Sequence, residues 1–131
     1  MTSRHALESR VDFLPMDKIF IDGLKIPCVI GIFPWERKIR QPIVIDLEFP
    51  ANIRKASRTD KIQDAVDYKK ISKFTLSFVG KSQFFLIETL AEKLAAALIK
   101  KFHLREIQLR VSKPGALRHA NNVGLVINRK K

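Results

Sequence analysis

The chain has 131 residues, of which 46% are hydrophobic and 29% are charged, a composition that fits one globular domain and excludes a disordered chain. Its single cysteine, Cys28, excludes an internal disulfide bond and favours a reduced, cytoplasmic setting. The formal net charge of +12 raises the question of nucleic-acid binding. However, the basic residues are scattered with few aromatic residues among them, which favours a solvated surface or attraction of a phosphorylated small molecule over nucleic acid.

Residues 1–15 show no sustained hydrophobic period, and Pro15 closes the segment. We interpret them as an N-terminal extension, either a frayed terminus or a coding start placed upstream of the true one. An orderly pattern begins at Met16, so residues 16–131 are predicted to form a single domain. No membrane partner is expected, because the most apolar stretch, residues 26–35, is far shorter than the ~20 residues that span a bilayer.

Two strands are predicted in the first half of the chain. The first covers residues 19–30, where alternate positions are Leu24, Ile26, Cys28 and Ile30. Gly23 is expected to form a bulge or bend within this strand. The second strand covers residues 43–49 and ends at Pro50, and the hydrophobic positions on one face are Ile43, Ile45, Leu47 and Phe49.

Helical spacing follows. Thr59 and Asp60 are residue types that cap the start of a helix, and Gly80 is typical of a helix end, so a first helix is predicted between them. Its hydrophobic side chains include Tyr68, Ile71, Phe74 and Phe78. A second helix is predicted from about Phe85 to Phe102, with leucines four residues apart at Leu86, Leu90, Leu94 and Leu98.

Strand alternation returns over residues 107–111, breaks at Pro114 and Gly115, and reappears over residues 123–127. The order ββααββ predicts an α+β fold, with two layers: a four-stranded antiparallel sheet and two helices on one face. The other face and the edges of such a sheet need a partner, so self-association is expected.

The sequence contains no motif that is typical of a metal site or of nucleotide-cofactor binding. The three histidines, His5, His103 and His119, share no metal-ligand spacing, and Cys28 stands in a strand pattern. Glycine-rich phosphate-binding motifs do not occur. We therefore predict no metal site and no cofactor.

Two charged residues stand in apolar surroundings. Glu88 is either an ordinary acidic residue of a first helical turn or a carboxylate that binds a planar, guanidine-like N–H pair in a bidentate manner. Lys113 follows a strand on its hydrophobic side, where it either extends its ammonium to solvent or loses proton affinity by desolvation and serves as an acid/base group.

Two further residues admit a structural and a functional interpretation. Tyr68 follows Asp67 where a loop meets a helix, and its phenol either packs there with a solvated hydroxyl or takes part in proton transfer. Glu36 follows Trp35 in the loop between the first two strands, and by itself it is interpreted as surface charge.

Four short segments, in order and spacing, resemble dihydroneopterin aldolase, a lyase of the folate pathway: GIFPWE (31–36), DY (67–68), LIETLAE (86–92) and SKPGA (112–116). The resemblance covers about residues 17–129. It implies the tunnelling fold, assembled as a homotetramer or as a homo-octamer of two stacked tetramers, with active sites between neighbouring subunits.

The resemblance also implies the reaction: 7,8-dihydroneopterin is cleaved to 6-hydroxymethyl-7,8-dihydropterin and glycolaldehyde, without metal, Schiff base or other cofactor. The N5=C6 bond of the substrate accepts the electrons of the broken bond, so the protein has to supply positioning and proton transfer. Side epimerase activity is included in this expectation.

By the same resemblance, Glu88 and backbone groups at Ile87 would hold the pterin, and Lys113 would be the principal acid/base group, acting through water. Tyr68, from the same or the adjoining subunit, would shuttle or hydrogen-bond the side-chain hydroxyl proton. Glu36 would orient Lys113 and that water, and both Tyr68 and Glu36 would contact the substrate. The alternatives are a dihydroneopterin triphosphate 2′-epimerase, which the excess of basic residues favours, and, more distantly, a basic nucleic-acid-binding module.

Overall fold

The computed structural model describes residues 17–131, and the predicted extension over residues 1–15 lies outside that range. Four strands make up one sheet: β1 (Lys18–Cys28), β2 (Gln41–Pro50), β3 (Glu106–Ser112) and β4 (Gly124–Lys130). The helices are α2 (Arg54–Thr59), α3 (Tyr68–Lys81) and α4 (Ile87–Phe102), with short 3-10 turns η1 (Glu36–Lys38) and η2 (Ile62–Asp64).

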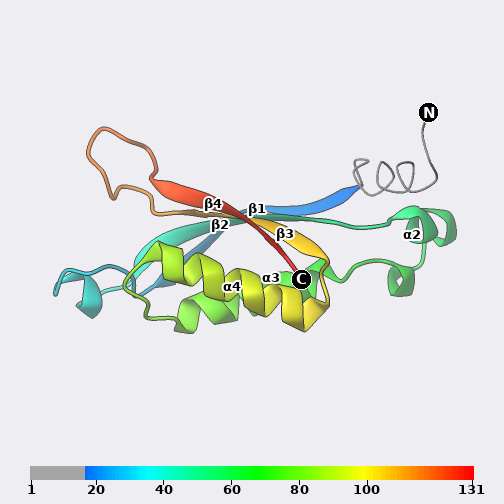
Figure 1. Cartoon of the computed structure of the whole chain (residues 1–131), viewed down its shortest axis with the longest axis horizontal. Coiled ribbons are helices and arrows are strands. Elements are labelled where there is room, and N and C mark those ends of the chain that lie inside the picture. The colour runs from blue at the N-terminus through cyan, green and yellow to red at the C-terminus, as the bar shows by residue number, and fades with distance from the viewer. Residues whose placement is uncertain (1–16) are drawn as a thin grey trace, which may run out of the picture.

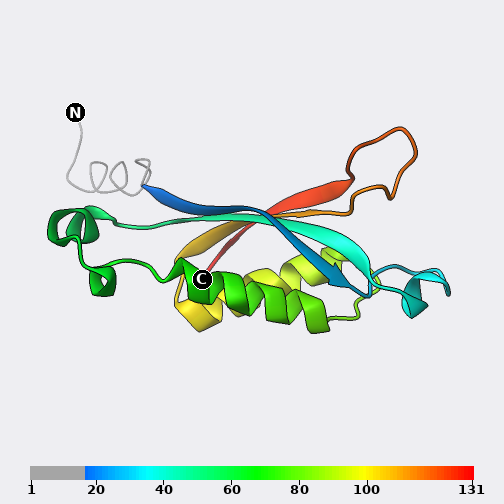
Figure 2. The same cartoon turned by 180° about the vertical axis from the view of Figure 1, so that it is seen from behind.

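The sheet is antiparallel with the strand order β1-β2-β3-β4, and α3 and α4 cover one of its faces (Figures 1 and 2). Helix α3 packs on β1, and α4 packs on β3 and β4. This arrangement confirms the predicted two-layer α+β fold. Within the described residues, no helix combines the length and the apolar character needed to cross a membrane.

The core lies between the sheet and the two long helices, and it is built from the positions at which the hydrophobic pattern predicted burial. In β2, alternate side chains are buried, at Ile43, Ile45, Leu47 and Phe49. Helix α4 contributes a stripe four residues apart, at Leu90, Leu94 and Leu98, all 0% exposed. Burial of one such side chain stabilises a fold by about 1.5–3 kcal/mol. The three leucines together therefore fix which face of α4 lies on the sheet.

The bend predicted at Gly23 is present as a bulge in β1. The pairing of β1 with β2 shifts register between Ile21 and Leu24, and Gly23 has a φ of +73°. Its N–H donates a hydrogen bond of 2.6 Å to Oδ1 of Asp46 on β2. Glycine suits this position because it has no side-chain penalty in the left-handed region.

The predicted start of the first long helix was wrong. Thr59 ends the short helix α2, and Asp60 follows it in the left-handed conformation with φ +57°. Helix α3 begins at Tyr68, where the Asp67 side chain accepts a hydrogen bond of 3.1 Å from the Lys70 N–H. Aspartate favours helix starts but also tolerates the left-handed conformation at helix ends, so its presence alone does not identify which end it marks.

Two other helix ends differ slightly from the prediction. Helix α3 continues one residue past Gly80, to Lys81, and Ser82 follows it as a cap. Helix α4 begins at Ile87 rather than at about Phe85. Leu86, which precedes the helix, has an extended conformation. The carbonyl oxygen of the neighbouring Phe85 accepts a hydrogen bond of 3.1 Å from the Gly31 N–H in the loop after β1.

Candidate functional site

A cavity of about 440 Å³ lies at the end of the sheet where β1 and β3 finish and β2 begins. Its walls come from three segments: the loop after β1, the turn that leads into α4, and the loop after β3. These segments bring Glu36, Glu88 and Lys113 to one place, together with Ile87. A volume of this order suits a small planar ligand.

Glu36 and Lys113 are joined by a direct ion pair. The Lys113 Nζ lies 2.7 Å from Glu36 Oε2, with exposed side-chain fractions of 16% and 6%. Two neutral donors complete the shell of the carboxylate: Gln41 Nε2 donates to Oε2 at 3.0 Å, and the Phe33 N–H donates to Oε1 at 3.1 Å. A carboxylate this well buried requires such partners, because desolvation of an unpaired charge is strongly unfavourable.

These donors lower the pKa of Glu36 to about 2. The largest cause is the hydrogen bond from Lys113, followed by that from Gln41, and both outweigh the opposing effect of burial. Glu36 is therefore ionised at neutral pH. The surface-charge interpretation of Glu36 does not describe this side chain, which is only 4% exposed as a residue.

Glu88 lies in the first turn of α4 and lines the cavity. The side chain is exposed, and among residues 17–131 its carboxylate makes no salt bridge. An acidic side chain in a first helical turn interacts favourably with the free N–H groups of that turn. Glu88 thus presents its two carboxyl oxygens as hydrogen-bond acceptors to whatever occupies the cavity.

Tyr68 does not join this group within one chain. It is the first residue of α3 and is 55% exposed, whereas the cavity lies near the other end of that helix. A helix of 14 residues is about 20 Å long, so the phenol is far from Lys113 of its own chain. Figure 1 shows α2, which precedes Tyr68, at one end of the molecule and the β1–β2 and β3–β4 loops at the other.

Two residues that support the ion pair were not singled out by the sequence analysis. Gln41, the first residue of β2, binds Glu36 and also donates to Ile30 O at 2.9 Å. Gly31 has φ +122°, and a Cβ at this position would overlap the Glu36 carboxyl group. Gly31 stands in the GIFPWE segment, so its left-handed conformation could have been suspected, whereas an isolated glutamine carries no comparable signal.

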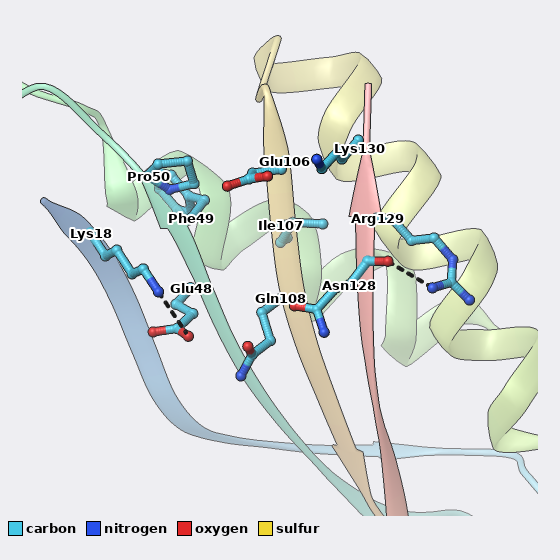
Figure 3. Close-up of a pocket in the computed structure, with 10 residues that line it drawn as sticks. All are labelled: Lys18, Glu48, Phe49, Pro50, Glu106, Ile107, Gln108, Asn128, Arg129 and Lys130. Atoms are coloured by element: carbon cyan, nitrogen blue, oxygen red, sulfur yellow. Dashed lines mark hydrogen bonds and ion pairs between the residues drawn. The ribbon is translucent and has the colours of Figure 1, made fainter. Parts of the chain in front are cut away.

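A second hollow, of about 130 Å³, lies at the opposite end of the sheet, where Lys18 pairs with Pro50 and Glu106 with Lys130 (Figure 3). The Lys18 and Glu48 side chains point toward each other there, at 3.8 Å, and are 55% and 33% exposed. A solvated ion pair of this kind contributes little and is readily screened. The larger cavity, with its buried pair, is therefore the better candidate site.

Comparison with known proteins shows that most of the chain matches one protein family. The family model described as dihydroneopterin aldolase matches residues 19–128. The dihydroneopterin aldolase of Escherichia coli (strain K12) is 37% identical over 114 residues, which cover 87% of this chain and 93% of that protein. The enzyme of the same name from Haemophilus influenzae is 34% identical, with coverage of 87% and 97%.

The similarity extends to three-dimensional structure. The crystal structure of Escherichia coli dihydroneopterin aldolase in complex with neopterin superposes with a TM-score of 0.83 at 37% identity. The superposition covers 87% of this chain and 99% of that chain. Residues 19–128, which the family model matches, include both long helices and all three walls of the cavity.

Proposed function

This chain belongs to the dihydroneopterin aldolase family, and we propose that its cavity between Glu36, Lys113 and Glu88 is the active site for cleavage of 7,8-dihydroneopterin. Members of this family are lyases of folate synthesis, so the chain is an enzyme of that class. The products are 6-hydroxymethyl-7,8-dihydropterin and glycolaldehyde. The observation that carries the proposal is the buried Lys113–Glu36 pair, 2.7 Å apart, in the same cavity as Glu88, whose carboxylate makes no salt bridge with any of residues 17–131.

Glu88 is proposed to bind the pterin. Its exposed carboxylate can accept two parallel hydrogen bonds from the ring amino group and the adjacent ring N–H, in the bidentate geometry that a guanidine-like edge offers. Backbone groups at Ile87 lie beside it. The apolar walls at Phe33, Trp35 and Phe85 suit the two faces of a flat bicyclic ring.

The chemistry is a retro-aldol cleavage. Removal of the C2′ hydroxyl proton breaks the C1′–C2′ bond and releases glycolaldehyde, and the electron pair moves from C1′ through C6=N5 onto the ring nitrogen. The resulting enamine is then protonated at C1′. Lys113, hydrogen-bonded to the ionised Glu36, supplies and recovers protons through a bound water, and Glu36 holds the ammonium in place.

Tyr68 of a neighbouring subunit is proposed to complete the site by contacting the C2′ hydroxyl. The distance within one chain supports a contribution from a second copy, and so does the position of β1 and β4 at the two edges of the sheet that residues 17–131 form. Phe20 and Val126, on the face away from the helices, are 71% and 51% exposed. We propose a homotetramer or homo-octamer that covers these surfaces.

The direct test is an assay for glycolaldehyde with the purified full-length protein and 7,8-dihydroneopterin, after dialysis against a chelator. We expect stoichiometric glycolaldehyde and 6-hydroxymethyl-7,8-dihydropterin, unaffected by the chelator. Borohydride added during turnover should not inactivate the enzyme, because no Schiff base forms. Absence of glycolaldehyde would reject the proposed function, and loss of activity on chelation would reject its metal-free form.

The triphosphate 2′-epimerase is the second candidate, and the net charge of +12 is the observation that favours it. Comparison of kcat/KM for neutral and triphosphorylated dihydroneopterin decides between the aldolase and the epimerase. A preference for the triphosphate would overturn the proposal of an aldolase. The distant alternative, a nucleic-acid-binding module, requires steeply salt-dependent binding of DNA or RNA. The expected cytoplasmic location stays a prediction.

A further inference from the structure

We infer that Arg37 is a positioning residue of this site, an inference that rests on the proposed function. Two walls of the cavity come from distant parts of the chain. The loop of residues 31–36 carries Glu36, and the turn of residues 83–86 leads into α4 and Glu88. The spacing of these walls sets where the bound pterin lies relative to the Lys113–Glu36 pair.

The guanidinium of Arg37 contacts both walls. Its Nη1 donates hydrogen bonds of 3.0 Å to the carbonyl oxygens of Gly31 and Phe84, and Nη2 donates to Gln83 O at 2.5 Å. The guanidinium carbon also lies 4.0 Å from the centre of the Phe85 ring, which lines the cavity. One side chain therefore joins the loop after β1 to three successive residues of the turn before α4.

Arginine is the residue type that can make this set of contacts. Its planar fork carries five N–H donors and stacks on an aromatic ring, whereas a lysine ammonium is a compact point charge on a flexible stem. The salt bridges found among residues 17–131 do not involve Arg37. Its donors are instead directed at backbone oxygens and its charge at the Phe85 ring.

The place of Arg37 in the chain links it to the reacting groups without contact with substrate. It follows Glu36 directly in η1, so movement of Arg37 moves the carboxylate that holds Lys113. Arg37 is half-buried behind the wall and does not itself line the cavity. Its loss should therefore misalign bound substrate with Lys113 rather than remove a binding contact.

The experiment compares the full-length variants Arg37→Met and Arg37→Ala with wild type, using kcat, KM, neopterin affinity and Tm. We expect kcat for dihydroneopterin to fall about tenfold or more in Arg37→Met, because sub-ångström alignment is lost. The Kd of neopterin should change less than about threefold, because Glu88 remains. Millimolar guanidinium ion should restore part of kcat in an Arg37→Ala variant.

Arg40 supplies the matched control. Its Nη1 also bridges two backbone carbonyls, of Pro27 and Gly80, but neither of these residues lines the cavity, whereas Gly31 and Phe85, which Arg37 contacts, do. Arg40→Met should lower Tm by a similar amount and leave kcat within about twofold of wild type. Equal kcat in the two methionine variants, or kcat losses that simply follow Tm, would overturn the inference. An inactive wild-type protein would instead reject the proposed function.

Discussion

At the scale of single residues, two charged side chains of the cavity differ in their surroundings. Lys113 is held by Glu36, whereas the Glu88 carboxylate is exposed to the cavity. The ion pair holds the Lys113 side chain in place, whereas the Glu88 carboxyl oxygens can accept hydrogen bonds from a ligand. Binding and turnover should therefore respond to different substitutions.

The corresponding prediction separates Glu88→Ala from Lys113→Ala. Loss of a charge-assisted bidentate contact in Glu88→Ala should weaken neopterin binding about a hundredfold. Lys113→Ala should lower kcat about a hundredfold or more, with a much smaller change in Kd. Fluorescence titration and steady-state kinetics measure both. Lys93→Ala, on an exposed part of α4, and Glu106→Ala are the matched controls, and exchanged effects would mean that the two roles are reversed.

A second prediction at this scale concerns acid stability. Because the folded state lowers the pKa of Glu36 from 4.5 to about 2, the carboxylate stabilises the fold above about pH 4.5 and loses this contribution as the pH falls toward 2. In Glu36→Gln this contribution is absent, so Tm should depend less on pH in that window than it does in wild type. Glu106→Gln, at a carboxylate without a salt bridge among residues 17–131, should keep the wild-type profile.

At the scale of elements, the loop after β1 depends on its one glycine, Gly31. Gly31→Ala places a Cβ where the Glu36 carboxyl group lies and strains a φ of +122°. We expect a destabilisation of about 1–3 kcal/mol, together with a marked loss of activity, because the carboxylate has to move. Gly80→Ala is the control, since no atom lies near its added Cβ and alanine favours a helix. Equal effects of both substitutions on activity would contradict this account.

The elements also show which local patterns were reliable. The hydrophobic positions of β2 and α4 have regular periods and lie on buried faces, as predicted. The helix start predicted at Thr59 and Asp60 was wrong, because short polar residues occur at helix starts, at helix ends and in turns. The actual start at Tyr68 is set by Asp67, whose side chain caps α3.

At the scale of the whole molecule, the separation of Tyr68 from Lys113 makes a prediction about mixed assemblies. Tyr68→Ala and Lys113→Ala should each be nearly inactive alone. If each site takes Tyr68 from one subunit and Lys113 from another, unfolding and refolding an equal mixture should restore roughly a quarter of the sites. Light scattering measures the size of the assembly in the same samples. No recovery in a mixed oligomer would contradict a shared site.

The amino-acid order alone sufficed for the four strands, the buried faces of the two long helices and the family resemblance, because periods of two and of about 3.6 residues are local properties of the backbone. It also singled out Glu36, Glu88 and Lys113. It did not indicate the short helix α2. Only the packed fold decided that Glu36 and Lys113, 77 residues apart, form a buried ion pair, and that Gln41 donates a hydrogen bond to Glu36. The fold likewise decided that Arg37 joins the loop after β1 to the turn before α4. Such contacts depend on how distant segments pack, which no local pattern specifies.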